Sequence, residues 1–349
     1  MTATRLLLSV LVIFVLFACD RDSGPGDAAG VDPQTRPGPD EAERVDDEET
    51  RTAGEPVLEI AIELPAPATA MVASADNRLF VALRDDDDQN PALVELDSDG
   101  QAEAWPDSTP PDSGRALTGI RALHIDDEGA LWILDAGPRL LRVDLMQDQF
   151  TREIRLDEAF PDAGHQPDGL GVDAELGVAY IIDSGEPGLV VLDMYTDEAR
   201  RMLEDTPALR PATDEGNGRA HMVLSPDLRY LLWQPRGSSD IYRLETEVMQ
   251  FTELDTEELT SMVEHFGTPG PARALAMDPA GLLYVAVIDD DESVIVRIDH
   301  FGTPDIVSRE AALAGITAMS STRGGDLLIG VDGDGDKPPR LLRLLGATQ

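Results

Sequence analysis

The stretch GALWILD at residues 129–135 recurs in related form along the chain, at intervals of about 44 to 53 residues. This spacing is the period at which four-stranded propeller blades repeat. Each copy is almost continuously apolar, as is typical of a strand covered on both faces. The other copies are NRLFVAL (77–83), GVAYIID (177–183), LRYLLW (228–233), GLLYVAV (281–287) and GDLLIGV (325–331). Six copies predict six blades.

Further strand signals surround each copy and complete a blade. An alternating run with small residues precedes it, as at 120–125, and an Asp- and Gly-rich turn joins the two, as at 126–129. A third apolar strand follows each copy, and the predicted third strands are 92–97, 139–144, 188–193, 240–244, 294–299 and 340–344. Outer fourth strands are predicted at 101–105, 150–156, 199–203, 252–255 and 305–308.

The last repeat leaves no room for a fourth strand before Gln349. The run VLEIAIEL at 57–64 precedes the first repeat and belongs to none of them. We expect this run to form the outer strand of the last blade, because such a clasp leaves no half-built blade. The sequence thus predicts an all-β fold: a six-bladed β-propeller over 57–349, with an N-terminal strand closing the last blade.

The N-terminus has a different character. An apolar run at 6–17 follows Arg5 and is short for a membrane span. Ala18 and Cys19, the only cysteine of the chain, come directly after it. This pattern predicts a lipoprotein signal peptide at 1–18 and lipidation of Cys19, with ordinary secretion or an uncleaved anchor as alternatives. Residues 19–56 are rich in Asp, Glu, Gly and Pro and predict a disordered acidic tether. We expect an exported, membrane-anchored protein that faces the periplasm or the cell surface.

The charge balance is extreme, with 68 acidic against 27 basic residues and a formal net charge of −41. Nucleic-acid binding requires the opposite sign, so that class of partner is not expected. The acids are spread over every repeat, which favours a salt-adapted surface over a dedicated device for capturing cations.

Three segments carry a resemblance to a known family. Residues 129–145 resemble the "RLWVLDTG…PqLlvfDL" signature of the Yellow and major royal jelly proteins, and residues 179–203 resemble "aYiaDsg…gLiVyDl…sRRvl". Residues 220–244 are similar to "GialSpDg…LYwqPl…LyrI" of bacterial members. The resemblance implies a six-bladed, TolB-like propeller. The family's roles include pigment-pathway proteins, nutritive proteins and binders of biogenic amines, so it implies the fold more firmly than the function.

Ligands of propellers usually enter the central funnel, at the face with the loops that lead into the first strands. The candidates for ligand binding are therefore the charged or polar residues at or just before first strands, each of which could instead serve a solvated loop or an ion pair between blades. Arginines at the axis can fork onto a carboxylate. The candidates are Arg121, Asp168, Arg219, His221 and Arg273.

Metal sites find weaker support. Asp168 lies in a phrase that resembles one carrying a metal ligand in the gluconolactonase and regucalcin-like hydrolases, but arginines stand where other ligands are expected. Asp332, Asp334 and Asp336 imitate the start of a calcium loop, yet Arg343 replaces the Glu that an EF-hand needs. Weak Ca²⁺ binding there is conceivable, and no other cofactor is expected.

These patterns predict a monomeric, lipid-anchored propeller that binds a small polar or aromatic ligand in its axial funnel, without covalent catalysis. One alternative is an enzyme, either dopachrome-tautomerase-like or a metal-dependent lactonase of the gluconolactonase type. A protein-interaction scaffold is the other alternative. An arginine-lined funnel favours the binder, and an exposed apolar face favours the scaffold.

Overall fold

The protein is described by a computed structural model, and the chain divides into two units, residues 1–51 and 52–349. All residues that the structure describes lie in the second unit: 56–84, 90–97, 99–110, 114–212, 219–251, 253–289, 292–334 and 337–346. The predicted signal peptide, Cys19 and nearly all of the predicted tether lie outside these ranges. None of the helices in these ranges is long and apolar enough to cross a lipid bilayer.

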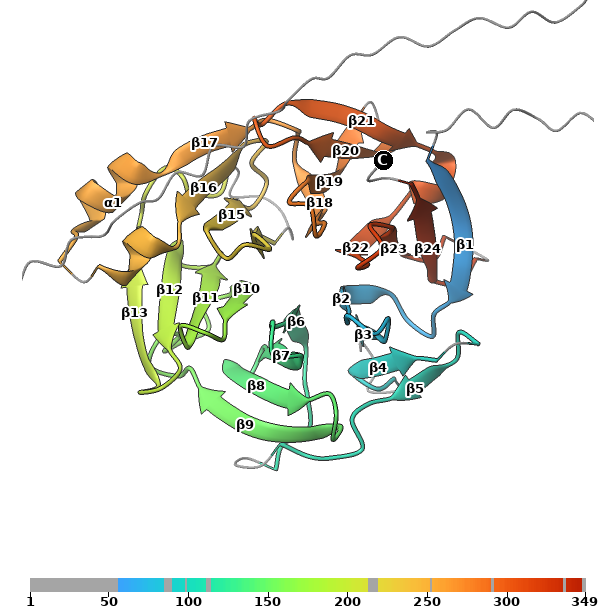
Figure 1. Cartoon of the computed structure of the whole chain (residues 1–349), viewed down its shortest axis with the longest axis horizontal. Coiled ribbons are helices and arrows are strands. Elements are labelled where there is room, and N and C mark those ends of the chain that lie inside the picture. Colours follow the sequence, from blue (N-terminus) through green and yellow to red (C-terminus); the bar gives the residue numbers. More distant parts are fainter. Residues whose placement is uncertain are drawn as a thin grey trace, which may run out of the picture. The chain divides into compact units, whose positions relative to one another are not determined.

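Six four-stranded antiparallel sheets surround a central axis (Figure 1). The inner strands are β2 (Ala68–Ala73), β6 (Ile120–Ile125), β10 (Pro167–Asp173), β14 (His221–Leu224), β18 (Ala272–Met277) and β22 (Ile316–Ser321). The second strands are β3 (Leu79–Leu83), β7 (Ala130–Asp135), β11 (Val178–Asp183), β15 (Tyr230–Gln234), β19 (Leu283–Asp289) and β23 (Leu327–Val331).

The third strands are β4 (Leu93–Leu96), β8 (Arg139–Asp144), β12 (Gly188–Asp193), β16 (Ile241–Glu245), β20 (Glu292–Ile298) and β24 (Arg340–Leu345). The outer strands are β5 (Ala102–Ala104), β9 (Gln149–Arg155), β13 (Glu198–Met202), β17 (Glu264–Gly267), β21 (Pro304–Arg309) and β1 (Val57–Glu63). The six-bladed all-β fold predicted from the repeats is confirmed.

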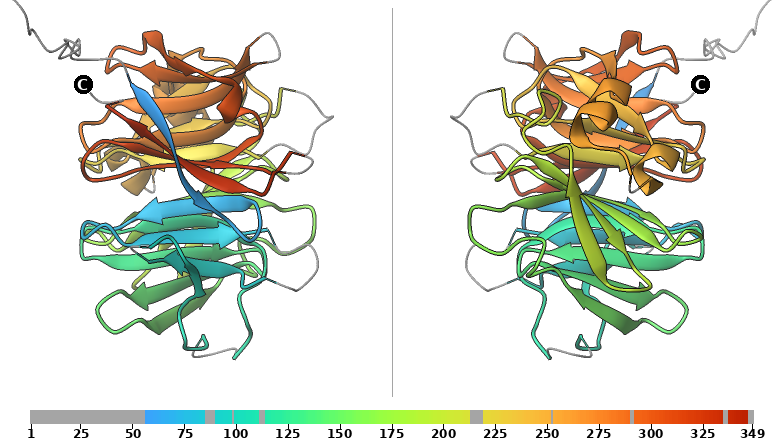
Figure 2. Two further views of the ribbon diagram at one scale, coloured as in Figure 1. Left: turned by 90° about the vertical axis from the view of Figure 1, so that its right-hand side faces the viewer. Right: turned by 90° about the vertical axis from the view of Figure 1, so that its left-hand side faces the viewer.

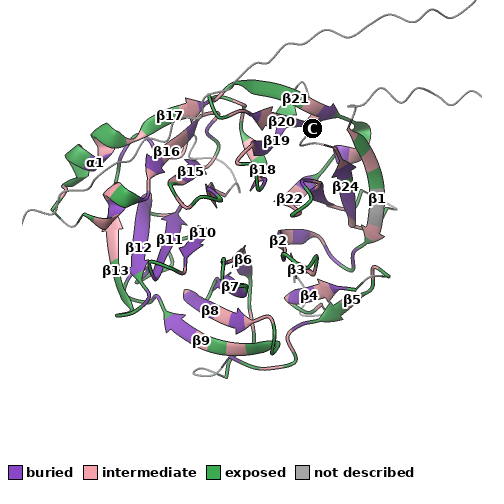
Figure 3. Cartoon of the chain, in the orientation of Figure 1, coloured by how far each residue is buried: buried purple, intermediate pink, exposed green. Residues whose placement is uncertain are grey.

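The recurring apolar phrase forms the second strand of every blade. All residues of β3, β7, β11 and β23 are buried, because blades stack face to face and cover both sides of each sheet. Figure 3 shows burial concentrated in the inner and middle strands, whereas the outer strands are more exposed. The apolar clusters span neighbouring blades; one of them contains Trp132 of β7 and Leu170 of β10.

The N-terminal strand closes the ring as predicted. The last sheet has the order β1-β24-β23-β22, and β1 pairs antiparallel with β24 in a register that sets Leu58 opposite Leu344. Figure 2 shows β1 in blue running along the outer edge of the red strands of the last blade. The clasp joins the two ends of the propeller by main-chain hydrogen bonds and by Leu58, which packs on the core of that blade.

The outer strand of the fourth blade was predicted wrongly. Residues 253–255, the described part of the predicted strand, are not a strand; the chain instead forms a 3₁₀ helix η1 (Glu247–Gln250) and a helix α1 (Thr256–Met262), and the strand follows at Glu264–Gly267. Asp255 caps α1: its side chain accepts a hydrogen bond from the amide of Glu258, whose side chain binds the amide of Asp255. This capping box starts a helix where a strand was expected.

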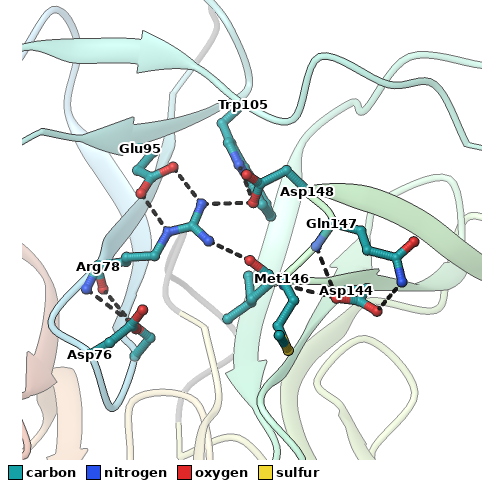
Figure 4. Close-up of polar contacts among 10 residues, drawn as sticks. Asp76, Arg78, Glu95, Trp105, Asp144, Met146, Gln147 and Asp148 are labelled. Atoms are coloured by element: carbon teal, nitrogen blue, oxygen red, sulfur yellow. Dashed lines mark hydrogen bonds and ion pairs between the residues drawn. The ribbon is translucent and has the colours of Figure 1, made fainter.

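An arginine fastens the first blade to the second (Figure 4). Arg78 binds both oxygens of Glu95 at 2.6 and 2.7 Å and Asp148 Oδ1 at 2.7 Å, and it donates to the carbonyl of Leu145 at 2.6 Å. Its guanidinium lies over the ring of Trp105, with 5.8 Å to the centroid. The bonds to Asp148 and Leu145 cross the seam between the two blades at a partly buried site, and Glu95 of the first blade holds the guanidinium in place.

The next two seams use the same device. Arg152 of the second blade donates to the carbonyl of Met194 in the third, and it binds Asp197 Oδ1 at 2.6 Å. Arg200 of the third blade donates to the carbonyl of Met249 in the fourth. Arginine side chains therefore donate to turn carbonyls across three consecutive seams, and at the first two they also bind a carboxylate.

Candidate functional site

A β-bulge recurs at the start of the inner strand in five of the six blades. In the second blade, for example, Ile120 pairs with Asp135 and Ala122 with Leu134, so that Arg121 has no partner in the ladder. A bulge turns the extra side chain away from the regular alternation, and such devices are common beside functional sites. The residues left unpaired in this way are Thr69, Arg121, Asp168, Arg273 and Thr317.

These five residues line one cavity at the hub, on the side where the inner strands begin. Its volume is about 410 Å³. We call it the axial cup. The fourth blade has no bulge in its inner ladder and contributes Arg219 and His221 instead. All five residues predicted as ligand-binding candidates, Arg121, Asp168, Arg219, His221 and Arg273, therefore lie in the wall of the same cavity.

Sequence reasoning missed three polar members of this wall. Arg84 follows β3 directly, at the start of the loop between the second and third strands of the first blade. Thr69 and Thr317 stand at the bulge positions of the first and last blades. Aligning the six inner strands on Arg121 and Asp168 would have identified both threonines, since each precedes a small residue in an otherwise regular strand.

A ring of apolar side chains forms the floor of the cup. One residue comes from each blade, two positions after the bulge where a bulge exists, and all six also line a second cavity of about 430 Å³ at the opposite end of the hub. The ring thus separates the two cavities. Its members are Met71, Leu123, Leu170, Met222, Leu275 and Met319. Thioether side chains adapt readily to the shape of a bound group.

Asp168 is the acid of the wall, and its side chain is only 1% exposed. Its Oδ2 accepts hydrogen bonds from the hydroxyl of Ser184 and from the amide of Ala220, the latter at 3.3 Å. Burial raises the pKa of this carboxyl, while the bond from Ser184 and the charges of Arg219 and Arg121 act in the opposite direction. Oδ1 has no hydrogen-bond partner among the described residues.

The loop leading into β10 is held in place by a second buried carboxylate. Asp183, at the end of β11, accepts from the amide of Gln166 at 2.8 Å and binds His165 Nδ1 at 2.6 Å and Arg201 at 3.0 Å. Because Gln166 lies two residues before Asp168, this cluster fixes the strand start that presents Asp168 to the cup. We assign these groups a structural role.

Positive charge dominates the cup. Arg84, Arg121, Arg219 and Arg273 line it against Asp168, and Arg84 also pairs with Asp332 at 3.3 Å. Burial lowers the pKa of Arg219, the charges of Arg121 and Arg84 lower it further, and Asp168 opposes them. Arginine nevertheless stays protonated in proteins. Among the described residues, these four cations exceed Asp168 and Asp332 together by two charges, in a chain whose net charge is −41.

His221 is a neutral member of the wall. Burial lowers its pKa to about 4, and the charges of Arg219 and Arg273 contribute to the shift, whereas a hydrogen bond to the backbone of Ala272 opposes it. At pH 7 the imidazole is therefore uncharged and adds a hydrogen-bonding group to the cup without adding to its positive charge.

The donor set of the cup does not suit a divalent metal. Among the described residues that line the cup, Asp168 is the only carboxylate, and the described ranges hold no group of three His, Cys, Asp or Glu that could bind a metal ion. In the predicted calcium loop, Asp332 pairs with Arg84, Asp334 forms an isolated bridge with Lys337, and Asp336 lies outside the described residues. Arg343 binds Asp326 at 2.6 Å.

Comparison with known proteins gives one family and one fold. The family model described as "Major royal jelly protein" matches residues 118–301, just over half of the chain. No curated protein matches the sequence significantly.

Among solved structures, a gluconolactonase from Xanthomonas campestris is similar at 16% identity and a TM-score of 0.55, over 82% of this chain and 88% of that one. A catalytically inactive virginiamycin B lyase from Staphylococcus aureus with quinupristin is similar at 13% identity and a TM-score of 0.51, over 83% and 99% of the two chains. The β-propeller domain of Cps50 (Swd1) from Myceliophteria thermophila is similar at 13% and 0.51, over 82% and 99%. Identities this low show the fold alone.

Proposed function

We propose that this chain, which belongs to the major royal jelly protein family, binds a small organic anion in the axial cup. The observation that carries the proposal is the concentration of four arginines around one cavity of about 410 Å³. Guanidinium groups bind carboxylates and phosphates through paired hydrogen bonds, which are stronger than neutral ones.

The electrostatics of the cup support an anionic ligand. Arg219 is partly buried beside Arg121 and Arg84, and both neighbours lower its pKa, which means that they repel its charge. A bound anion would relieve this repulsion, whereas an amine would add to it. The narrow, positively charged cavity also attracts anions over the background of an acidic chain. A cationic biogenic amine is therefore a poorer fit than an acid.

The floor of the cup indicates what the rest of the ligand looks like. Three methionines and three leucines close the cavity beneath the arginines, and thioethers pack well against aromatic rings. A molecule with an acidic head and an apolar or aromatic body would place the head at the wall and the body on this floor.

Isothermal titration calorimetry in buffered salt tests the proposal with three matched probes: phenylacetate, phenethylamine and benzyl alcohol. We expect phenylacetate to bind best. Arg219→Gln should weaken its binding at least about tenfold, since a hydrogen bond to a charged group contributes about 1.5–3 kcal/mol. Arg309→Gln is the matched control, because Arg309 pairs with Asp289 and Glu292 away from the cup and its loss should leave binding unchanged. Tighter binding of phenethylamine, or unchanged binding in Arg219→Gln, would refute the proposal.

We also propose that the mature protein is exported as a monomer and anchored to a membrane through lipid on Cys19. The apolar run at 6–17 followed directly by Ala18-Cys19 supports this reading. Mass spectrometry of the membrane fraction should find an N-terminal peptide that begins with an acylated Cys19. The Cys19→Ser variant should lose the lipid; a lipid-free wild-type N-terminus would contradict the proposal.

A further inference from the structure

The buried carboxylate of the cup is only half satisfied. Asp168 Oδ2 accepts two hydrogen bonds, from Ser184 and Ala220, whereas Oδ1 accepts none from the part of the chain that the structure describes, although the side chain is 1% exposed. A buried acceptor without a partner is costly, and native proteins rarely keep one without a purpose. Since Asp168 lines the cup, Oδ1 is the place where a ligand donor would restore the missing bond.

The neighbouring arginine does not fill this place. Arg121 Nη1 lies 3.9 Å from Asp168 Oδ1, too far for a hydrogen bond, and Arg121 Nε is likewise buried with no hydrogen-bond partner within the described ranges. The Arg121 side chain is 32% exposed, so unlike Asp168 it is accessible to solvent. Because Oδ1 is itself buried, a ligand group can bind it only after a neighbouring side chain moves, and Arg121 is a neighbour that can turn toward solvent.

We propose that Asp168 and Arg121 together recognise a hydroxyl group of the ligand, which rests on the proposed binding of an organic anion. An oxygen about 2.8 Å from each of two atoms that are 3.9 Å apart can donate its proton to Oδ1 and accept one from Nη1. A hydroxyl group can make both bonds. An ammonium group can only donate, and the surplus of arginines disfavours it.

The wall also places this hydroxyl close to the acid group of the ligand. Arg219 directly precedes Ala220, whose amide binds Asp168 Oδ2, and Arg219 Nη1 donates to the backbone carbonyl of Arg121 at 3.3 Å. A carboxylate held by Arg219 therefore lies beside a hydroxyl held between Asp168 and Arg121. The ligand class that fits is a 2-hydroxycarboxylate, in which the two groups are on adjacent carbons.

Three aromatic acids test this inference on the wild-type protein by calorimetry: mandelate, its O-methyl ether and phenylacetate. Mandelate should bind at least about tenfold more tightly than phenylacetate. Only mandelate has a hydroxyl group that can donate a hydrogen bond to the carboxylate of Asp168. The affinity of mandelate should also exceed that of O-methylmandelate by a similar factor, because an ether oxygen has no proton to donate to Asp168 Oδ1.

The Asp168→Asn variant replaces the hydrogen-bond acceptor Oδ1 with a hydrogen-bond donor. The bonds from Ser184 and Ala220 keep the amide oxygen in the place of Oδ2, so the NH₂ group takes the place of Oδ1 and becomes a donor. O-methylmandelate should then bind as well as mandelate. The control Asp157→Asn, at an exposed ion pair with Arg155, should keep the wild-type preference.

The possible results separate the inference from the proposal on which it depends. If phenylacetate and mandelate bind to the wild type with equal affinity, the hydroxyl site is refuted and anion binding stands. If none of the three acids binds, the proposed function fails as well. Because the wild-type comparison needs no variant, the inference can be tested even if Asp168→Asn does not fold.

Discussion

Acid should destabilise the propeller through a histidine at its hub. His124 lies on β6 and lines the second cavity of the hub, on the other side of the apolar ring from the axial cup. Burial lowers its pKa to about 4, although Asp126, Asp127 and a hydrogen bond to the backbone of Val172 oppose the shift. In the unfolded chain the same imidazole titrates near its ordinary value of about 6.5.

The sign and size of the effect follow from this difference. Between pH 6.5 and pH 4 the unfolded chain binds a proton at His124 that the folded protein does not, so stability falls as the pH falls through this window. At pH 5 the expected loss relative to neutral pH is about 2 kcal/mol for His124 alone. His221, whose pKa is also lowered to about 4, adds a second loss of the same sign.

Urea denaturation at pH 7 and pH 5, in constant high salt, measures the effect. The drop in unfolding free energy between the two pH values should be smaller in His124→Gln than in the wild type by about 2 kcal/mol. The exposed His300 provides the control, since His300→Gln should keep the wild-type drop. An unchanged drop in His124→Gln would show that His124 titrates normally in the folded state and would refute the reasoning.

Three further predictions concern the scaffold. Arg78→Ala should lower the unfolding free energy by about 2 kcal/mol, because it leaves a partly buried carboxylate unpaired at the first seam. Arg155→Ala, which removes an exposed ion pair, should leave the unfolding free energy unchanged. If calorimetry finds the two variants equally stable, the role of Arg78 at the seam is contradicted. Gly169→Ala should lower the unfolding free energy by about 1–3 kcal/mol through overpacking, since the added Cβ would lie 2.6 Å from the Cβ of a methionine on β14. Urea denaturation measures this loss, and Gly137→Ala, whose added Cβ would have no atom within 4 Å, is the control. Thermal unfolding in increasing KCl should give a rising melting temperature, as salt screens the net charge of −41; a melting temperature independent of salt would exclude a salt-adapted surface.

The blade count could be predicted because each second strand is buried on both faces and therefore repeats as an apolar phrase. The clasp followed from counting, since residues 57–64 had no blade of their own and the last blade lacked a strand. The outer strand of the fourth blade could not be placed in this way. Outer strands are half exposed and carry a weak pattern, and the Asp255–Glu258 capping box was overlooked.

Part of the wall of the cup could also be predicted from the regular apolar pattern of the strands. Arg121, Asp168 and Arg273 stand at strand starts, where a charged residue interrupts an apolar pattern. Their shared orientation depends on bulges, which the sequence pattern does not reveal. The unpaired Oδ1 of Asp168 and the ion pair between Arg84 and Asp332 depend on side-chain geometry, and only the structure could show them.

A crystal structure of the protein grown with phenylacetate tests the central claim most directly. The account predicts density for the ligand in the axial cup, with its carboxylate within hydrogen-bonding distance of Arg219 and at least one other arginine of the wall, and its ring on the methionine and leucine floor. A cup that holds only solvent at saturating phenylacetate, or a ligand bound elsewhere on the propeller, would contradict it.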